Sequence, residues 1–237
     1  MTTFNLPKKL ARLFKITAEA IRLPLVRLDF RKNVDVPDIN EMFLHFTKPH
    51  PRYKIIRNKS VGMAIVDLSG FADRSAYLSS VSRKDQGAYH GKRALRRGFI
   101  FQEIDQNSYI DDIHAINTSV SERQGRPMDP AYFERPTHYD KKPHFRYFGI
   151  LNSDGALVAY CNIATYGNFA ATDRLLGYKN NDGTMYLLLV EIICKLIDDS
   201  QVQYFMYDTF LGAQEGLRNF KRRLGFQPYR VHYSLIQ

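Results

Sequence analysis

Apolar and polar positions follow strand-like and helix-like periods in turn through the last third of the chain. Apolar runs at 145–151 and 156–163 flank Asn152-Ser153-Asp154-Gly155, in which Gly155 can supply the positive φ of a hairpin turn. Residues 185–197 are apolar on almost every side, which is typical of a helix inside a packed domain. The pattern therefore predicts an antiparallel strand pair followed by a buried helix.

The elements around that helix predict a crossover. Residues 173–178 form a candidate strand before the helix, and 202–210 form a buried strand after it. A strand, a helix and a strand at this spacing imply a parallel, right-handed connection. We expect 202–210 to lie parallel beside 156–163, with a groove between them. A last helix at 213–224 ends at Gly225, and 227–236 is a closing strand.

This order of elements resembles the GNAT acyltransferase fold, so the expected fold class is α/β (α+β): a mixed sheet with an antiparallel meander, one parallel crossover and helices on both faces. The tail is more specific. Asp208 closes a strand, and Gly-Leu-x-x-Phe-Lys-x-x-x-Gly at 216–225 resembles the motif of the Fem-type (FemAB-like) aminoacyl-tRNA-dependent transferases, which carry an aromatic residue where Leu224 stands here. The resemblance covers 82–237, the expected GNAT-like acyltransferase domain. Residues 1–81 are expected to be an N-terminal extension or a partial lobe packed on the core.

The first half of the chain predicts further elements. Residues 6–23 form a basic amphipathic helix, which suits either peripheral membrane contact or packing on its own domain. Ser82 and Asp85 have the spacing of a capping box that would open a helix ended by Gly98. The other predicted segments are strands at 25–35, 53–56, 61–68 and 99–104, helices at 38–46 and 108–122, and a polar loop at 129–143 that is long enough to be a lid.

The charge of the chain favours an anionic partner. Lys and Arg number 34 against 24 Asp and Glu, which gives a formal charge of +10. Such a surface suits tRNA, a nucleotide-containing cofactor, an acidic carrier protein or a lipid surface. Cys161 and Cys194 both fall in apolar runs, so we expect buried thiols in a reducing cytoplasm. The Cys and His spacings do not indicate a zinc site, and we expect no metal.

Two groups of basic residues are candidates for donor or substrate binding. The helix opened by Ser82 carries Arg83, Lys92, Arg93, Arg96 and Arg97, which suits either phosphate contacts or a solvated helix face. The loop Arg123-Gln124-Gly125-Arg126 places two guanidinium groups after a helix, where they could hold a carboxylate or phosphate, or bind carbonyls at the helix end. Arg222 belongs with these candidates.

Candidate catalytic side chains lie on the central strands and the last helix. Amide formation requires deprotonation of the amine, stabilisation of an oxyanion and protonation of the leaving group. Tyr160 and Tyr166 are candidates for protonating the leaving group, and Asp208 for orienting the amine or taking its proton. The Fem resemblance implies that Lys221 acts at the donor phosphate or the developing charge; otherwise it is an exposed helix lysine. His114, His138 and His144 are possible bases.

The expected reaction is transfer of an acyl or aminoacyl group to a small amine. Gly177 and Gly183 are too far apart to match the pyrophosphate loop of acetyl-CoA-dependent GNAT proteins, and Asp182 would repel a pyrophosphate. We therefore expect aminoacyl-tRNA as the donor, with no tightly bound cofactor. The alternatives are an acyl-CoA or acyl-carrier-protein donor, or a non-catalytic, basic RNA- or membrane-associated protein of the same fold.

Overall fold

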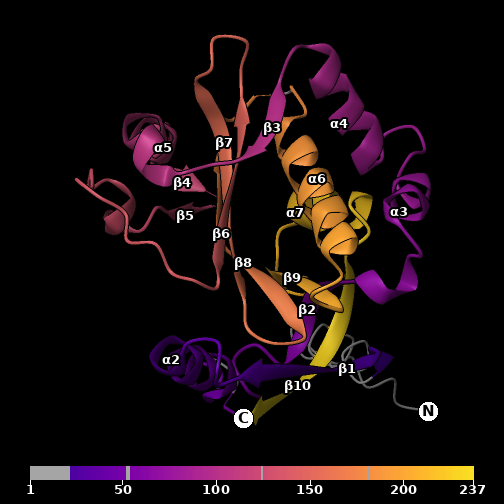
Figure 1. The fold of residues 1–237 in the computed structure, drawn as a ribbon. Coiled ribbons are helices and arrows are strands. Elements are labelled where there is room, and N and C mark those ends of the chain that lie inside the picture. The colour runs from indigo at the N-terminus through magenta and orange to yellow at the C-terminus, as the bar shows by residue number, and fades with distance from the viewer. Residues whose placement is uncertain (1–21, 52–53, 124, 181) are drawn as a thin grey trace, which may run out of the picture.

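The computed structural model describes residues 22–237 apart from 52, 53, 124 and 181. These form an eight-stranded mixed sheet in the order β1-β10-β2-β9-β8-β7-β6-β3 (Figure 1). Its strands are β1 (Leu25–Arg31), β2 (Val61–Asp67), β3 (Ile100–Glu103), β6 (Phe145–Leu151), β7 (Leu157–Thr165), β8 (Phe169–Gly177), β9 (Tyr204–Thr209) and β10 (Gln227–Ile236). A separate small hairpin joins β4 (Glu122–Arg123) to β5 (Arg126–Pro127).

Helices cover both faces of this sheet, as predicted. They are α2 (Val36–Thr47), α3 (Arg74–Ser80), α4 (Gly87–Arg96), α5 (Ile110–Thr118), α6 (Thr184–Asp199) and α7 (Glu215–Arg223). The buried face of α6 packs with α3, α4 and one side of the sheet into the largest core cluster. On the other side, α5 covers β7 with Ile113 and Ile116. Figure 1 shows α5 and α6 on opposite sides of the central strands.

The predicted hairpin and crossover are both present. Gly155 has a φ of +80°, and the Asn152 side-chain oxygen accepts the backbone N–H groups of Asp154 at 3.0 Å and Ala156 at 2.9 Å. Helix α6 connects β8 to β9, and these two strands are parallel. The positive φ of Gly225, +88°, ends the last helix as expected.

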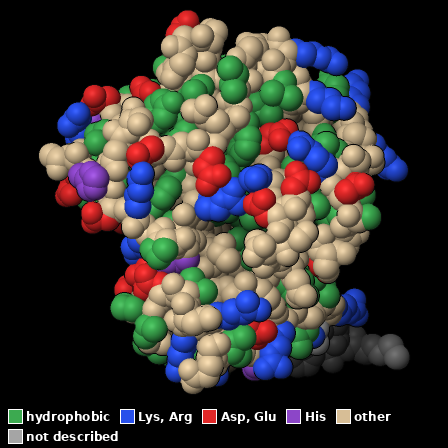
Figure 2. Space-filling view, viewed as in Figure 1, with side chains coloured by type: hydrophobic (Ala, Val, Ile, Leu, Met, Phe, Trp, Pro, Cys, Tyr) green, Lys and Arg blue, Asp and Glu red, His purple; other side chains and the backbone are tan. Residues whose placement is uncertain are grey.

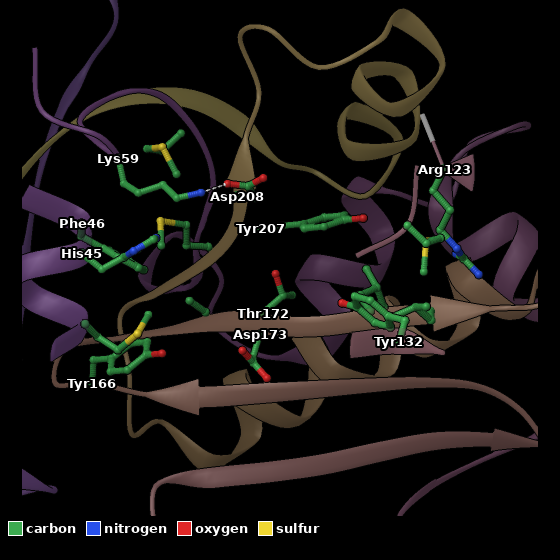
Figure 3. Close-up of a pocket in the computed structure, with 17 residues that line it drawn as sticks. His45, Phe46, Lys59, Arg123, Tyr132, Tyr166, Thr172, Asp173, Tyr207 and Asp208 are labelled. Atoms are coloured by element: carbon green, nitrogen blue, oxygen red, sulfur yellow. Dashed lines mark hydrogen bonds and ion pairs between the residues drawn. The ribbon is translucent and has the colours of Figure 1, made fainter. Parts of the chain in front are cut away.

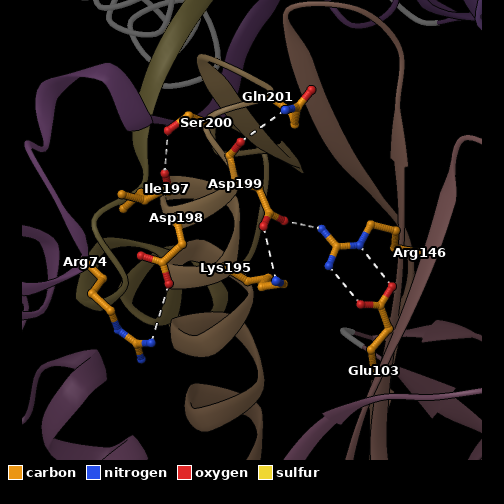
Figure 4. Close-up of polar contacts among 9 residues, drawn as sticks. All are labelled: Arg74, Glu103, Arg146, Lys195, Ile197, Asp198, Asp199, Ser200 and Gln201. Atoms are coloured by element: carbon orange, nitrogen blue, oxygen red, sulfur yellow. Dashed lines mark hydrogen bonds and ion pairs between the residues drawn. The ribbon is translucent and has the colours of Figure 1, made fainter.

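An ion-pair network fixes the end of α6 against the sheet (Figure 4). The guanidinium of Arg146 on β6 donates to Asp199 at 2.7 Å and to Glu103 of β3 at 2.8 and 3.0 Å. Lys195 contacts Asp199 at 3.1 Å. The crossover helix is thereby tied to two strands of the meander.

One predicted pairing is wrong. The parallel neighbour of β9 is β8, and β7 lies one strand further away and runs antiparallel to β8. The entering strand, expected from 173, begins at Phe169, because β7 and β8 are joined by a very short turn at Tyr166–Asn168. A second parallel pair, β1 with β10, was not predicted.

Two local predictions also fail. The capping box at Ser82 does not open a helix, because Asp85 takes a φ of +65° and α4 begins only at Gly87. The segment before it contains α3, capped by the Asp73 side chain, which was not predicted. Residues 54–56 form a turn rather than part of a strand at 53–56. Gly98, with a φ of +85°, does follow the end of α4.

The first third of the chain contributes to the same sheet as the rest. Strand β2 pairs with both β9 and β10, and β1 extends the sheet beyond β10. Whether 1–81 form a distinct unit stays a prediction. The predicted amphipathic helix at 6–23 lies almost entirely outside the described residues. Among the helices that the structure describes, none has the length and apolar character to cross a membrane.

Candidate functional site

The centre of the sheet opens where β8 and β9 part. The two strands pair only at Phe169–Ala171 with Tyr204–Met206. Beyond that point β8 has a bulge, since Asn162 pairs with Arg174 and Ile163 with Thr172, which leaves Asp173 as the extra residue. The register of β9 against β2 shifts at the same level, where Tyr207 and Asp208 stand. Both strands are therefore distorted at the point where they separate.

A cavity of about 390 Å³ lies at this opening (Figure 3). Thr172 and Asp173 from β8 and Tyr207 and Asp208 from β9 line it, together with residues of α2 and the β4–β5 hairpin. The predicted groove is thus present, but it separates β8 from β9. In Figure 3 the Thr172 side chain extends from its strand toward Tyr207.

Asp208 lies at the rim of this cavity in an unusual backbone conformation. Its φ is +44°, which few residues other than glycine adopt. Its carboxylate forms an ion pair with Lys59, which also lines the cavity. Desolvation opposes ionisation of this carboxyl, but the charge and hydrogen bond of Lys59 outweigh it and hold the Asp208 pKa below its ordinary value.

Lys221 lies beneath the same strand and is not an exposed helix lysine. It is 1% exposed, and its ammonium donates to the carbonyls of Tyr207 at 2.6 Å and Thr209 at 2.7 Å. Nζ also lies 4.1 Å from the centre of the Tyr207 ring. Burial lowers the pKa of Lys221 to about 8. Its hydrogen bonds satisfy carbonyls on either side of Asp208, so Lys221 holds the distorted end of β9 in place.

The two predicted tyrosines are separated by the structure. Tyr166 lines the cavity, and burial raises the pKa of its hydroxyl. Tyr160 is buried on the side of the sheet covered by α5, where its hydroxyl donates to Asn117 at 2.6 Å. Tyr160 does not line the cavity.

The ionisable cavity residues that the sequence analysis did not select include Lys59, Asp173 and Tyr207. Burial raises the pKa of the Asp173 carboxyl, although Arg174 and the Asn162 amide partly oppose this shift. The sequence signal for Asp173 is a charged residue inside an otherwise mostly apolar strand. The bulge that places it at the cavity depends on the pairing with β7, which the sequence does not show.

A second cavity of about 400 Å³ lies at the N-terminus of α6. Gly183, with a φ of +85°, precedes the first turn of the helix, and His90 of α4 and Tyr186 stack beside it at 4.5 Å. Arg123 lines both this cavity and the central one, and its guanidinium donates to the carbonyl of Gly177 at 3.0 Å. Burial lowers the pKa of Arg123. This predicted residue therefore stands between the two cavities.

The other predicted basic residues lie outside both cavities. These are Arg83, Lys92, Arg93, Arg96, Arg97, Arg126 and Arg222. Arg97 binds Asp182 at 2.6 Å, and Arg222 binds Asn219 at 2.6 Å. Lys and Arg side chains gather on the surface near α4 (Figure 2).

The predicted histidine bases also lie outside the central cavity. His138 is exposed, whereas His144 is buried beside Asp35 and Asp38. The histidine that does line the cavity is His45 of α2, which the sequence pattern did not single out.

Comparison with known proteins places the fold. No protein-family model matches the chain, and no curated protein matches its sequence. FemX is similar in structure with a TM-score of 0.56 at 12% identity, covering 82% of this chain and 66% of that one. The structure of L-PGS from Bacillus licheniformis has a TM-score of 0.46 at 17% identity, covering 71% and 60%. A tandem GNAT protein of the clavulanic acid biosynthesis pathway has a TM-score of 0.46 at 16% identity, covering 71% and 50%.

These likenesses are structural, and their sequence identities are low. The chain spans less than two thirds of the length of these three structures. In this structure an antiparallel meander is joined to a parallel crossover, and the sheet opens at its centre. This is the GNAT-like fold expected from the sequence.

Proposed function

We propose that this protein is an acyltransferase that forms an amide bond between an activated acyl group and an amine in the cavity between β8 and β9. The parting of these two strands carries the proposal. It places the distorted parts of two strands beside ionisable side chains, in a cavity large enough for a small acceptor. The Fem-like motif at 216–225 supports it, because its lysine stabilises one of those strands.

The cavity offers groups for each part of the reaction. Attack by the amine forms a C–N bond and breaks the C–O or C–S bond to the donor. Asp173, whose pKa is raised by burial, is suited to take the amine proton, and the ionised Asp208 is suited to orient the amine. A Tyr207 or Tyr166 hydroxyl is suited to protonate the leaving oxygen or sulfur.

We propose aminoacyl-tRNA as the donor. Support comes from the Fem-like motif, the formal charge of +10 and the basic helix α4, whose His90 borders the second cavity. The aminoacyl end of a tRNA bound in the second cavity would reach the central cavity by passing Arg123, because Arg123 lines both cavities. This arrangement suits a reaction in the cytoplasm, where charged tRNA is available.

An acyl-CoA or acyl-carrier-protein donor is the second candidate. One observation favours it: Asp182, which would otherwise repel a pyrophosphate, is paired with Arg97 at 2.6 Å. The second cavity also lies at a helix N-terminus, where phosphate binds readily.

Mass spectrometry of product formation tests the proposal. The purified protein is mixed with aminoacyl-tRNA, acyl-CoA or acyl carrier protein and a panel of small amines. We expect an amide product with aminoacyl-tRNA that is lost in Asp173→Asn and kept in Glu134→Gln, an exposed control. Product with acyl-CoA alone would replace the donor assignment, and binding without product from any donor would leave the non-catalytic alternative.

A further inference from the structure

Two carboxylates and an imidazole meet at the junction of α2 with the start of β6. One ligand atom from each of Asp35, Asp38 and His144 lies within 4.8 Å of the others. Asp35 is the N-cap of α2, Asp38 lies in its first turn, and His144 directly precedes β6. None of the three lines the central cavity.

The imidazole is buried without the hydrogen bonds that it requires. The His144 side chain is 2% exposed, and neither ring nitrogen has a hydrogen-bond partner among the described residues. Nδ1 lies 3.9 Å from Asp35 Oδ2, and Nε2 lies 3.5 Å from Asp38 Oδ2. A buried polar atom without a partner destabilises the folded state. The ring is thus aimed at the two carboxylates but bonded to neither.

The carboxylates are only partly neutralised. Asp35 Oδ1 accepts the N–H of Asp38 at 3.2 Å and caps the helix, so its Oδ2 is the oxygen that faces His144. Lys142 brings one ammonium to Asp38 Oδ2. One positive charge beside two carboxylates leaves a negative balance, and the ring of Phe145, 5.5 Å from Lys142 Nζ, offers that ammonium another contact.

We propose that Asp35, Asp38 and His144 bind one divalent transition-metal ion, for which Zn²⁺ is the probe. Imidazole and carboxylate are suitable ligands for such an ion. Ligand atoms about 2.1 Å from a tetrahedral Zn²⁺ lie roughly 3.4 Å apart. One imidazole nitrogen binds a single ion, and one ligand atom from each residue lies within 4.8 Å of the others, so side-chain shifts on the order of 1 Å would complete the site.

The bound ion would join α2 to β6. Helix α2 supplies Met42, His45 and Phe46 to the wall of the central cavity. The metal would therefore stabilise that wall without taking part in the reaction, so this inference does not depend on the proposed activity.

Calorimetric titration of the EDTA-treated, full-length protein with Zn²⁺ tests the site, with melting temperature as a second readout. The variant Asp35→Ser is suited to it, because serine keeps the helix cap but removes the ligand oxygen. We expect one Zn²⁺ per chain and a higher melting temperature in the wild type, and at least tenfold weaker binding in Asp35→Ser. Circular dichroism without metal checks that the variant is folded.

Two further variants distinguish this site from Zn²⁺ binding elsewhere on the chain. Lys142→Met removes the competing ammonium and should bind Zn²⁺ more tightly, whereas His138→Ala removes an exposed histidine and should bind it unchanged. The proposal is overturned if the wild type binds no Zn²⁺, or if Asp35→Ser binds it as well as the wild type does. Zn²⁺ binding only in Lys142→Met would show that Lys142 is the resident cation and would also overturn it.

Discussion

Two basic regions of this chain, the Lys221 site beneath β9 and the surface of α4, use positive charge in different ways. Lys221 is 1% exposed and holds two backbone carbonyls at 2.6 and 2.7 Å, where β9 leaves its neighbour. Lys92 and Arg96 on α4 are exposed and lie outside both cavities. The first charge fixes a geometry, whereas the second contributes to a field around the protein.

The difference shows that residue type alone does not decide what a lysine does. Buried charge with fixed partners should control stability and the shape of the site, and should respond little to salt. Exposed charge should leave the free energy of unfolding unchanged. It should strengthen the binding of a polyanion such as tRNA, and this contribution should fall as the salt concentration rises. Substitutions in the two regions test this contrast.

The largest effect is expected from Lys221→Met. This substitution leaves the Tyr207 and Thr209 carbonyls without their buried donor, at roughly 1–3 kcal/mol for each. We expect the free energy of unfolding in urea to fall by about 2–5 kcal/mol. The exposed neighbour Arg222→Met is the control, with a change within about 0.5 kcal/mol. Equal stability of the two variants would contradict the structural role of Lys221.

The pH dependence of stability should report the same buried ammonium. The Lys221 pKa is about 8 in the folded protein against an ordinary value of 10.5. Between these values the unfolded chain binds the proton that the folded one has released, so this group makes folding more favourable as pH rises from 8 to 10.5. The gain is at most about 3 kcal/mol. Urea titrations of the wild type and Lys221→Met across this range should diverge, and parallel curves would be evidence against the lowered pKa.

Substitutions of Asp208 should change the free energy of unfolding less than Lys221→Met does, but they should also slow amide formation. Asparagine tolerates a positive φ, so Asp208→Asn should change stability by less than about 1 kcal/mol, while Asp208→Ala should cost about 1 kcal/mol more. Both variants lose the charge that pairs with Lys59, so both should form amide product at least tenfold more slowly. Full turnover in Asp208→Asn would remove the carboxylate from the proposed reaction.

The two tyrosines test which side of the sheet matters. Tyr160→Phe loses its hydrogen bond to Asn117 and should cost about 1 kcal/mol without slowing amide formation. Tyr166→Phe changes a side chain of the cavity and should slow it. A tenfold slower Tyr160→Phe with a normal Tyr166→Phe would show that the reaction lies on the α5 side.

The smallest effect on stability is expected from charge reversal on α4. Lys92→Glu with Arg96→Glu should change the free energy of unfolding by about 0.5 kcal/mol or less. Binding of tRNA, measured by filter binding at several salt concentrations, should weaken, and its salt dependence should become shallower. If the variant matches the wild type in both affinity for tRNA and salt dependence, α4 does not contact the donor.

The sequence predicts the order of the elements better than their contacts. The hairpin at Asn152–Gly155, the buried helix α6 and the end of α7 at Gly225 follow from local residue preferences, and the structure contains them. The partner of β9 was assigned wrongly, because strand neighbours depend on how distant segments pair. The helix start at Ser82 was also wrong, since Asp85 has a positive φ that its residue type did not indicate.

The candidate site was predictable only in part. Asp208, Tyr166 and Arg123 were selected from strand ends and a basic loop, and they line one cavity. Asp173 and Lys59 were missed, because a β-bulge and an ion pair between segments 149 positions apart bring them there. Lys221 was selected from its motif, but its burial beneath β9 became visible only in the folded chain.

Filling the central cavity is the sharpest test of the proposed reaction site. Thr172→Phe adds a ring to a side chain that extends into the opening between β8 and β9 (Figure 3). With the donor and amine that give product in the wild type, we predict at least 100-fold slower amide formation in this variant and a melting temperature within a few degrees of the wild type. Amide formation at the wild-type rate with the cavity filled would contradict catalysis between β8 and β9.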